Sequence, residues 1–417
     1  MQKSSTADRH CALLWDESFL WGIMSFRALK AAGLPFDLVR SEDIRNNVLH
    51  NYRMLFVPGG WASNKIAALG NGGIEAIRRF VEAGGNYLGF CGGAGLATLD
   101  GIGLLNIRRV PTKDRVPSFS GRLRFSLISH AIWDESLNKP DRTFHVWWPS
   151  QFSIVGPPAN ILAAYEEALP DSFSSDLNVG DVNKLSGGWE SLERTYGINL
   201  DPARLYGQPA VVEGNFGKGK VVLSLIHFDT PGDENGMAVL KGLWKYLAGA
   251  EAKGCEIKRE EGCRNPAPPD FRIFGLLAAA EDLIACGDRN FLWFWRNSML
   301  LQWRRGIRGL EYCTLYGMIK TVAEHSYRIA EDTVSFQKQI DEILNILLPF
   351  KHKAEKLLLL ERKALQDGNH ITYEKSDDPA IMQLRSELFA NSKSYGGMFK
   401  HLLDSIDKML YSLLRAA

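Results

Sequence analysis

The sequence lacks an excess of charge of either sign. Its 417 residues include 49 Lys and Arg against 48 Asp and Glu, which gives a formal net charge of +1. A chain so close to neutrality lacks the global positive field that favours binding to nucleic acid or to an anionic membrane surface. We therefore expect no nucleic-acid partner and consider membrane contact unfavoured. We expect the partner to be a small-molecule substrate or ligand.

Long apolar runs are also missing. No stretch approaches the roughly 18 uncharged apolar residues that a membrane-spanning helix needs. The N-terminal segment MQKSSTADRHCALLW has no apolar core of a secretory signal, so we expect a cytoplasmic protein. The 45% hydrophobic and 23% charged residues are typical of ordinary globular proteins.

Cysteine is sparse and is not arranged in metal-binding patterns. The six cysteines are spread over the chain without the spacing of metal ligands or of small disulfide-rich proteins. Cys255 and Cys263 flank a polar stretch, but nothing in the sequence pairs them. We expect reduced thiols, no metal site and no cofactor.

Short apolar runs alternate with helical patterns along roughly the first 100 residues of the chain. The expected strands are 11–15, 36–39, 54–57 and 87–90, and the expected helices are 19–32 and 73–83. Continuous apolar strands that alternate with helices indicate a parallel sheet covered on both faces. The fold class predicted for this part is therefore α/β, with a mostly parallel sheet.

The middle of the chain has a different pattern, with strands and long loops. The candidate strands are 121–128, 143–148, 161–165, 210–213 and 220–225, followed by a helix over 234–247. The polar, Gly- and Ser-rich segment 171–201 is predicted to be a long loop, and loops of that length are usually functional or mobile.

A charged and then proline-rich segment, GCEIKREEGCRNPAPPD at 254–270, is the expected linker. It separates a predicted first domain, 1–253, from a predicted all-α helical bundle domain, 271–417. Apolar residues recur at helical spacing along 335–348 and 399–414. The absence of any catalytic constellation here favours a role in oligomerisation or in binding a protein partner.

One segment of the helical half, RNFLWFWRNSMLLQWRRGIRGL at 289–310, combines five aromatic residues with five arginines and no acid. Interpreted as a helix, this mixture could lie on a membrane surface or bind an anionic partner. The alternative is a helix buried between neighbours, with arginines extending from its edges. Apolar residues lie almost all round the expected helix, which favours burial in a bundle or an oligomer interface.

The most informative segment runs from an apolar strand into a cysteine. Gly89-Phe-Cys91-Gly92-Gly93 has the form of a nucleophile elbow, a sharp strand-to-helix turn that tolerates only small residues near the nucleophile. At the start of a helix, Cys91 would feel the positive end of the helix dipole, which favours the thiolate. The alternative is a Gly-rich turn that buries an ordinary cysteine.

Two further motifs favour the nucleophile interpretation. Val57-Pro-Gly59-Gly60 ends the preceding strand, and its amides could complete an oxyanion hole with Gly92. Another apolar strand leads into His227-Phe-Asp229. A histidine at a strand end can act as the base of a thiol, and a carboxylate can fix its tautomer. The alternative interpretation of the first motif is a turn that simply ends a strand. The alternative for the second is a histidine with a purely structural role.

The motifs together resemble class I glutamine-amidotransferase-like domains. VPGG at 57–60, GFCGG at 89–93 and HFD at 227–229 occur in the order of that superfamily. The chain most resembles the N-terminal domain of biotin-protein ligases, over about residues 10–250. Further support comes from three segments: HVWWPSQF at 145–152, LAAY at 162–165 and PAVVEGNFGKGKVV at 209–222.

The resemblance implies a flavodoxin-like sheet and a Cys–His–acid triad, with Cys91 as nucleophile, His227 as base and Asp229 as acid. Gly60 and Gly92 match the positions of the oxyanion hole, and their neighbours Gly59 and Gly93 are expected to bind oxyanion or substrate with them.

An acid after the first strand can contact the thiol in related proteins, so Glu17 is a candidate accessory acid. Alternatively, Asp16, Glu17 and Ser18 form the N-terminal cap and first turn of the following helix.

Two departures from the family pattern argue against ordinary glutamine hydrolysis. Gly95 occupies the position where glutaminases usually have a glutamine that helps to hold the substrate. Asp229 follows Phe228, where glutaminases usually have a glutamate after a proline. The helical half has no Gly-rich ATP-binding signature, and the biotin-ligase catalytic region is missing, so biotinylation is not expected.

The sequence thus supports two functional hypotheses. In the first, the protein is a cysteine-dependent hydrolase or amidase that cleaves a C–N bond through a thioester at Cys91. In the second, the same pocket binds a small molecule without catalysis, and the helical domain serves assembly or partner binding. The complete Cys–His–Asp set favours the first hypothesis, and Gly95 favours the second.

Overall fold

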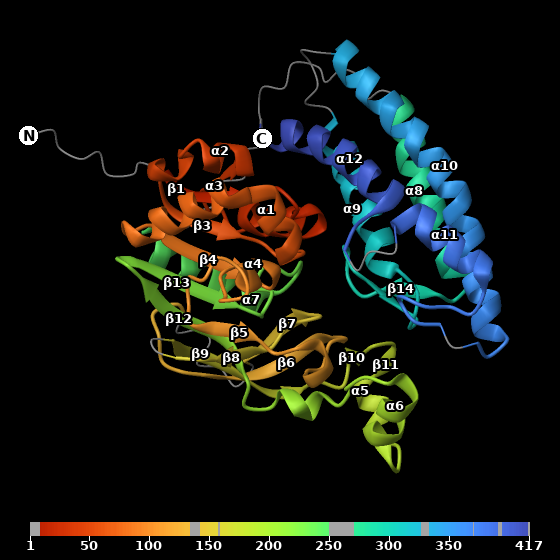
Figure 1. Cartoon of the computed structure of the whole chain (residues 1–417), viewed down its shortest axis with the longest axis horizontal. Coiled ribbons are helices and arrows are strands. Elements are labelled where there is room, and N and C mark those ends of the chain that lie inside the picture. Colours follow the sequence, from red (N-terminus) through yellow and green to blue (C-terminus); the bar gives the residue numbers. More distant parts are fainter. Residues whose placement is uncertain are drawn as a thin grey trace, which may run out of the picture. The chain divides into compact units, whose positions relative to one another are not determined.

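The computed structural model describes residues 9–133, 142–156, 159–249, 271–326, 333–369, 371–390 and 394–415. The chain divides into two compact units, Met1–Cys255 and Glu256–Ala417 (Figure 1). The expected linker at 254–270, with Cys255 and Cys263, lies outside the described residues.

The first unit is built on a large mixed sheet whose first half is parallel. Its neighbouring strands, in spatial order, are β2 (Asp37–Val39), β1 (Arg9–Leu14), β3 (Tyr52–Val57), β4 (Asn86–Phe90) and β13 (Gly219–Ser224). The residues of β3 from Met54 to Val57 are fully buried. A strand can be apolar on both faces only where helices cover both faces of the sheet.

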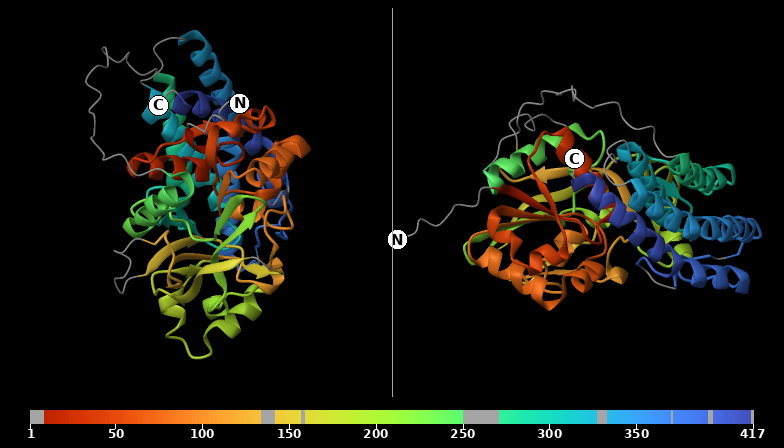
Figure 2. Two further views of the ribbon diagram at one scale, coloured as in Figure 1. Left: turned by 90° about the vertical axis from the view of Figure 1, so that its left-hand side faces the viewer. Right: turned by 90° about the horizontal axis from the view of Figure 1, so that it is seen from above.

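Helices pack on both faces of this parallel half (Figure 2). They are α1 (Phe19–Ala31), α2 (Ser41–Arg45), η1 (Val48–Asn51), α3 (Ala62–Glu82) and α7 (Glu234–Leu243), which continues as a single π-helical segment, η5 (Trp244–Ala248). Helix α3 contacts β4 and β13, and η5 contacts β3 and β4. The predicted α/β fold is confirmed.

The second half of the sheet is antiparallel and extends from β13. It comprises β12 (Pro209–Phe216), β9 (Asn160–Ala168), β6 (Phe119–Leu127), β7 (Thr143–Trp147), β10 (Phe173–Ser174) and β11 (Leu177–Asn178). A separate ribbon pairs β5 (Ile107–Arg109) with β8 (Phe152–Ile154). Two short helical turns, η2 (Thr112–Asp114) and η4 (Pro202–Leu205), connect these strands.

Two local expectations for this unit were wrong. The long loop expected over 171–201 contains β10, β11, α5 (Val179–Val182) and α6 (Gly188–Tyr196), and polar caps such as Asn178 explain why it looked like a loop. The helix expected from residue 73 begins at Ala62. Gly70 breaks its regular conformation with φ 59° and ψ 179°, which explains why the sequence pattern showed only its second part.

The second unit is a helical region, as predicted. Its helices are α8 (Phe271–Arg289), α9 (Gly309–His325), α10 (Thr333–Gln366), α11 (Pro379–Phe389) and α12 (Gly397–Arg415). The long α10 contacts α8, α11 and α12, and α12 also contacts α9. Among the described residues, no helix is both long enough and apolar enough to cross a membrane.

The helix expected over 289–310 is wrong. The segment forms a hairpin of β14 (Trp293–Trp295) and β15 (Leu301–Trp303). Trp293 is buried and folds against Gly287 of α8, where any Cβ would overlap its indole ring. Aromatic residues favour strands. In this hairpin successive side chains point to opposite faces, whereas a helix would place residues three and four apart on one face.

Two buried ion pairs tie the loops of the helical unit to its core. Arg308 contacts Glu311 at 3.0 Å, and Arg385 contacts Glu361 at 2.7 Å, with all four side chains at most 4% exposed. Arg385 also donates to the carbonyl oxygens of Gly306 and Thr372, at 2.7 and 2.8 Å. One guanidinium therefore links α10, α11 and two loops, and its loss would leave a buried carboxylate unpaired.

We predict that Arg385→Met destabilises the helical unit by about 3–5 kcal/mol, the usual cost of breaking a buried pair from one side. Arg362→Met is the control, because Arg362 lies one residue after Glu361 and makes an exposed hydrogen bond to Gln366. Calorimetry of the full chain measures the change, and hydrogen exchange in α11 assigns it to this unit. Equal stabilities of the two variants would contradict the prediction.

Candidate active site

Cys91 occupies a strained turn between a strand and a helix. It follows β4 directly, has φ 46° and ψ −102°, and precedes the short helix α4 (Gly92–Leu96). Its amide donates to the oxygen of Ser224 at the end of β13, and its own oxygen accepts from the Gly95 amide, both at 2.8 Å. Strain of this kind costs about 1–3 kcal/mol and is found mainly at functional sites.

The glycines around Cys91 are required by close backbone contacts. A Cβ at Gly92 would overlap the carbonyl oxygen of Gly60, and one at Gly93 would overlap that of Val57. Gly60 itself has φ 109°, which favours glycine. The turn after β3 and the turn after β4 therefore pack backbone against backbone, which places the predicted oxyanion residues side by side.

The amides of Gly60 and Gly92 are the predicted oxyanion donors. Within the described part of the chain, neither amide donates a backbone hydrogen bond. Gly59 lies on the same turn, where a Cβ would come within 3.2 Å of Cε1 of His227. The structure thus brings the VPGG turn, Cys91 and His227 together. The assignment of these amides to an oxyanion hole stays a prediction.

His227 follows β13 and is fully buried with Asp229. The Nδ1 atom of His227 lies 3.0 Å from Oδ1 of Asp229. Because an ionised carboxylate can only accept, Nδ1 donates this hydrogen bond. Nε2 is buried, has no hydrogen-bond partner among the described residues, and belongs to a ring that interacts electrostatically with Cys91.

The surroundings of His227 favour its protonated form. Burial alone would lower the pKa of the ring, but the charge and hydrogen bond of Asp229, together with the nearby Cys91, outweigh burial and raise the pKa to about 9. The ring is then an imidazolium at neutral pH.

Helix α1 supports the histidine–aspartate pair from one side. Ser25 donates from Oγ to Oδ2 of Asp229 at 2.5 Å, and the Trp21 ring lies 4.7 Å from the His227 ring, centroid to centroid. The two residues are four positions apart and share a face of the helix. Sequence analysis missed both, because nearly all of α1 is buried and no periodic stripe distinguishes this face.

Strand β7 supports the histidine turn from the other side. The His227 amide donates to the oxygen of His145 at 2.9 Å. Thr230 donates from Oγ1 to the His227 oxygen at 2.8 Å, and Trp147 donates from Nε1 to Thr230 at 3.0 Å. These bonds fix the backbone of His227, so its ring is positioned by two strands and one helix.

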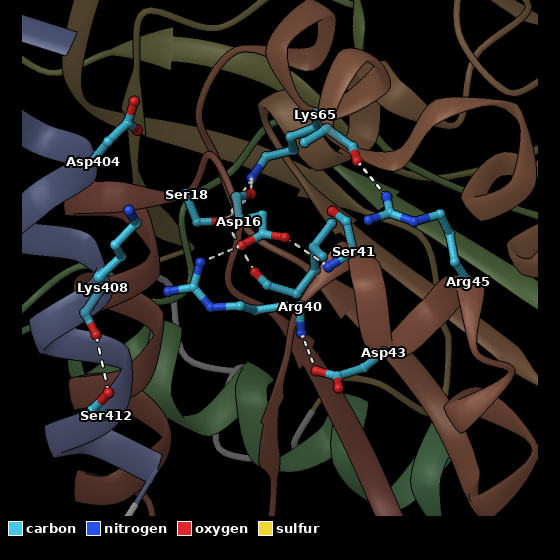
Figure 3. Close-up of polar contacts among 12 residues, drawn as sticks. Asp16, Ser18, Arg40, Ser41, Asp43, Arg45, Lys65, Asp404, Lys408 and Ser412 are labelled. Atoms are coloured by element: carbon cyan, nitrogen blue, oxygen red, sulfur yellow. Dashed lines mark hydrogen bonds and ion pairs between the residues drawn. The ribbon is translucent and has the colours of Figure 1, made fainter. Parts of the chain in front are cut away.

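The acids after the first strand have structural contacts (Figure 3). The carboxylate of Asp16 accepts from the Ser41 amide at 2.6 Å and from Arg40 at 3.0 Å, which places it at the start of α2 and not α1. Glu17 accepts from Asn64 at 3.2 Å. Ser18 is the N-cap residue of α1 but makes no side-chain capping bond. The accessory role of Glu17 stays a prediction.

A fully buried lysine, which sequence analysis missed, holds this segment beside the VPGG turn. Lys65 of α3 donates from Nζ to the oxygens of Asp16 and Glu17, at 3.3 and 3.2 Å, and to Oγ of Ser18 at 2.5 Å. Lysines are rarely buried without such partners, and no sequence pattern distinguishes this one from a surface lysine.

No metal centre is evident in the described ranges, where no group of three or more His, Cys, Asp or Glu side chains is arranged to hold an ion. The expectations of no metal and no cofactor stay predictions.

We predict that Gly92→Ala disrupts the elbow, because its methyl group would overlap the Gly60 oxygen. The variant should unfold at a lower temperature or lose the reactivity of Cys91. Gly72→Ala is the matched control in α3, where a Cβ meets nothing closer than 3.8 Å. That variant should be neutral or slightly more stable, by up to about 1 kcal/mol. Indistinguishable melting temperatures and thiol reactivities would contradict the prediction.

We predict that Asp229→Asn loses stability mainly at low pH. The pKa of His227 in the folded protein, about 9, exceeds the value of about 6.5 for a free histidine. The stabilisation of the folded state by the protonated His227 beside Asp229 is therefore complete below pH 6.5 and is lost as the pH rises through 9. The deficit of the variant should therefore shrink from pH 6 to pH 9 in urea unfolding. Ser25→Ala, which keeps the charge, is the control. A deficit that does not change with pH would rule out this charge coupling.

Comparisons with known proteins give a family match in the segment that contains this elbow. Residues 38–100 match the family model described as "Biotin-protein ligase, N terminal". The segment runs from β2 to just beyond α4 and includes VPGG and Cys91. The comparison with curated proteins gives no significant match.

Three solved structures are similar to this chain at low identity. A candidate GMP synthase subunit from Thermoplasma acidophilum is 12% identical, with a TM-score of 0.38, covering 58% of this chain and 96% of that one. A β-galactosidase from Bacillus circulans sp. alkalophilus is 12% identical with a TM-score of 0.36, covering 59% of this chain and 32% of the enzyme. An exo-β-1,4-mannosidase from an Opitutaceae bacterium is 12% identical with a TM-score of 0.33, covering 57% and 36%.

The family match confirms the resemblance inferred from the motifs over the segment that carries the elbow. Over residues 38–100 the α/β unit is similar to the N-terminal domain of biotin-protein ligases.

Proposed function

We propose that the α/β unit is a cysteine-dependent hydrolase that cleaves an acyl bond, preferably a C–N bond, through a thioester on Cys91. The observation that carries the proposal is the convergence of a strained cysteine with a buried histidine whose Nδ1 is held by Asp229 and whose Nε2 has no hydrogen-bond partner in the described structure. Family resemblance at the elbow supports it.

In the first half of the reaction, the Cys91 thiolate attacks the substrate carbonyl carbon, and the carbonyl electrons move to oxygen. The amides of Gly60 and Gly92 stabilise the resulting oxyanion. As the tetrahedral intermediate collapses, the proton on Nε2 of His227 passes to the leaving nitrogen. The products of this half-reaction are a free amine and a thioester on Cys91.

In the second half, water replaces the amine. The now neutral Nε2 of His227 takes a proton from water as its oxygen attacks the thioester carbon, and the sulfur leaves as a thiolate. The net reaction consumes one amide and one water and yields an acid and an amine. Asp229 keeps the imidazolium oriented throughout and transfers no proton.

The proposal does not extend to ordinary glutamine hydrolysis. Gly95 provides no side chain to hold a glutamine, and Phe228 packs into the core beside Phe90 and Phe144, in place of the usual proline. A second candidate function, small-molecule binding without catalysis, is favoured by Gly95. Assembly or partner binding by the helical unit, and a cytoplasmic location, stay predictions.

We predict that iodoacetamide alkylates Cys91 about tenfold faster at pH 7 than it alkylates N-acetylcysteine, because a thiolate is the reactive species. Peptide mapping of the full chain identifies the site, and Cys91→Ser shows the background. His227→Gln should remove most of the advantage. His50→Gln is the matched control, because it changes an exposed histidine that is distant in the sequence from His227.

Turnover distinguishes the two functions. A screen of amides, esters and thioesters with the wild type and Cys91→Ser should show activity only in the wild type. If Cys91 reacts no faster than the other thiols and Cys91→Ser changes no activity, catalysis is excluded. A reactive Cys91 with no turnover of any compound would favour the binding function.

A further inference from the structure

An arginine covers the position where glutaminases hold their substrate. Gly95 lies one helical turn after Cys91, and a Cβ there would come within 3.3 Å of Cδ and 3.6 Å of Nη1 of Arg109. Arg109 ends β5 and is exposed. Its side chain therefore lies beside α4, in space that a side chain at position 95 would otherwise occupy.

A second arginine, Arg115, lies on the loop that follows β5. Gln151 is buried and fixes the loop at both ends, because its backbone oxygen accepts from Val110 at 2.8 Å and its Oε1 accepts from Val116 at 2.9 Å. Arg115 lies between these anchors. Burial and the charge of Arg109 lower the pKa of Arg115, and Cys91 raises it, so the three groups are electrostatic neighbours.

Across the described ranges, no ion pair or hydrogen bond joins the guanidinium of Arg109 or of Arg115 to a carboxylate. The nearby Asp100 pairs with the guanidinium of Arg108, and from Arg109 it accepts only the backbone amide. The one side-chain bond given for Arg115 is a 3.4 Å contact with Thr112. Its Nε is buried and has no partner among the described residues.

Unpartnered buried polar atoms thus gather at Cys91. Nε of Arg115, Nε2 of His227 and the hydroxyl of Tyr165 are all buried without a hydrogen-bond partner in the described structure, and each of these residues interacts electrostatically with Cys91. Leaving such atoms unpaired is costly unless a ligand or water satisfies them. All three can donate a hydrogen bond to an anion.

We propose that Arg109 and Arg115 form an anion subsite beside Cys91, so that the substrate carries a carboxylate or phosphate next to its scissile acyl group. Guanidinium groups bind either anion through charge-assisted, often bidentate hydrogen bonds. The inference rests on the proposed function, since it names the substrate class of the same cysteine. It also explains Gly95, because a larger residue would displace Arg109.

Paired alkylating agents test the subsite directly. Iodoacetate and iodoacetamide react with the same thiolate and differ in the charge of the group they bring. We expect the iodoacetate-to-iodoacetamide rate ratio at Cys91 of the full chain to exceed that of N-acetylcysteine about tenfold or more. The ratio cancels changes in thiolate population, which a single rate would not.

Variants assign the effect to the two arginines. Arg109→Gln and Arg115→Gln should each lower the ratio severalfold while the iodoacetamide rate changes much less. Arg108→Gln is the matched control, because it removes the same charge from the adjacent residue, whose guanidinium already pairs with Asp100 at 2.9 Å. Arg109 is exposed, so its variant should fold even if the Arg115 variant does not.

Competition by malonate or by inorganic phosphate then identifies the anion. Slower iodoacetate labelling in malonate alone would indicate a carboxylate substrate, and slower labelling in phosphate alone would indicate a phosphate substrate. A wild-type ratio equal to that of N-acetylcysteine, or an equal loss in the Arg108 and Arg109 variants, would overturn the subsite. Failure of iodoacetamide to label Cys91 selectively would instead overturn the proposed function.

Discussion

The candidate active site depends on a backbone contact in which no side chain takes part. The turn after β3 and the turn after β4 meet so closely that a methyl group on Gly92 would overlap the oxygen of Gly60. This contact brings Gly92, next to Cys91, against Gly60 and fixes where β4 ends relative to β3. Packing of this density leaves almost no freedom for substitution, since local volume changes of even one methylene are felt.

Charged groups from several parts of the chain surround that contact. Asp229 binds the His227 ring, Ser25 of α1 and the backbone of β7 hold the pair, and Arg109 lies beside Gly95, one helical turn after the cysteine. On the proposed mechanism the buried carboxylate serves the histidine, and the unpaired guanidinium groups serve the substrate.

The parallel strands and the elbow could be predicted because they depend on local sequence: continuous apolar runs mark strands that are buried on both faces, and glycines mark a turn without room for side chains. Ser25, Trp21 and Arg115 could not be predicted, because they reach the site through tertiary packing that leaves no local signature. The hairpin at β14 and β15 was mistaken for a helix for a similar reason. Its short strands, rich in aromatic residues, pack on α8 and α9, contacts that no local pattern shows.

The hydrogen bond from Ser25 to Asp229 joins positions 204 residues apart. Cys91 is synthesised long before His227 and Asp229, whereas Ser25 is synthesised before all three. On the proposed mechanism, a growing or incompletely folded chain therefore carries an ordinary thiol, with no imidazolium beside it and no oriented carboxylate. Chemical reactivity would begin only when the last parallel strand, β13, inserts beside β4 and brings the end of the α/β unit back to its beginning.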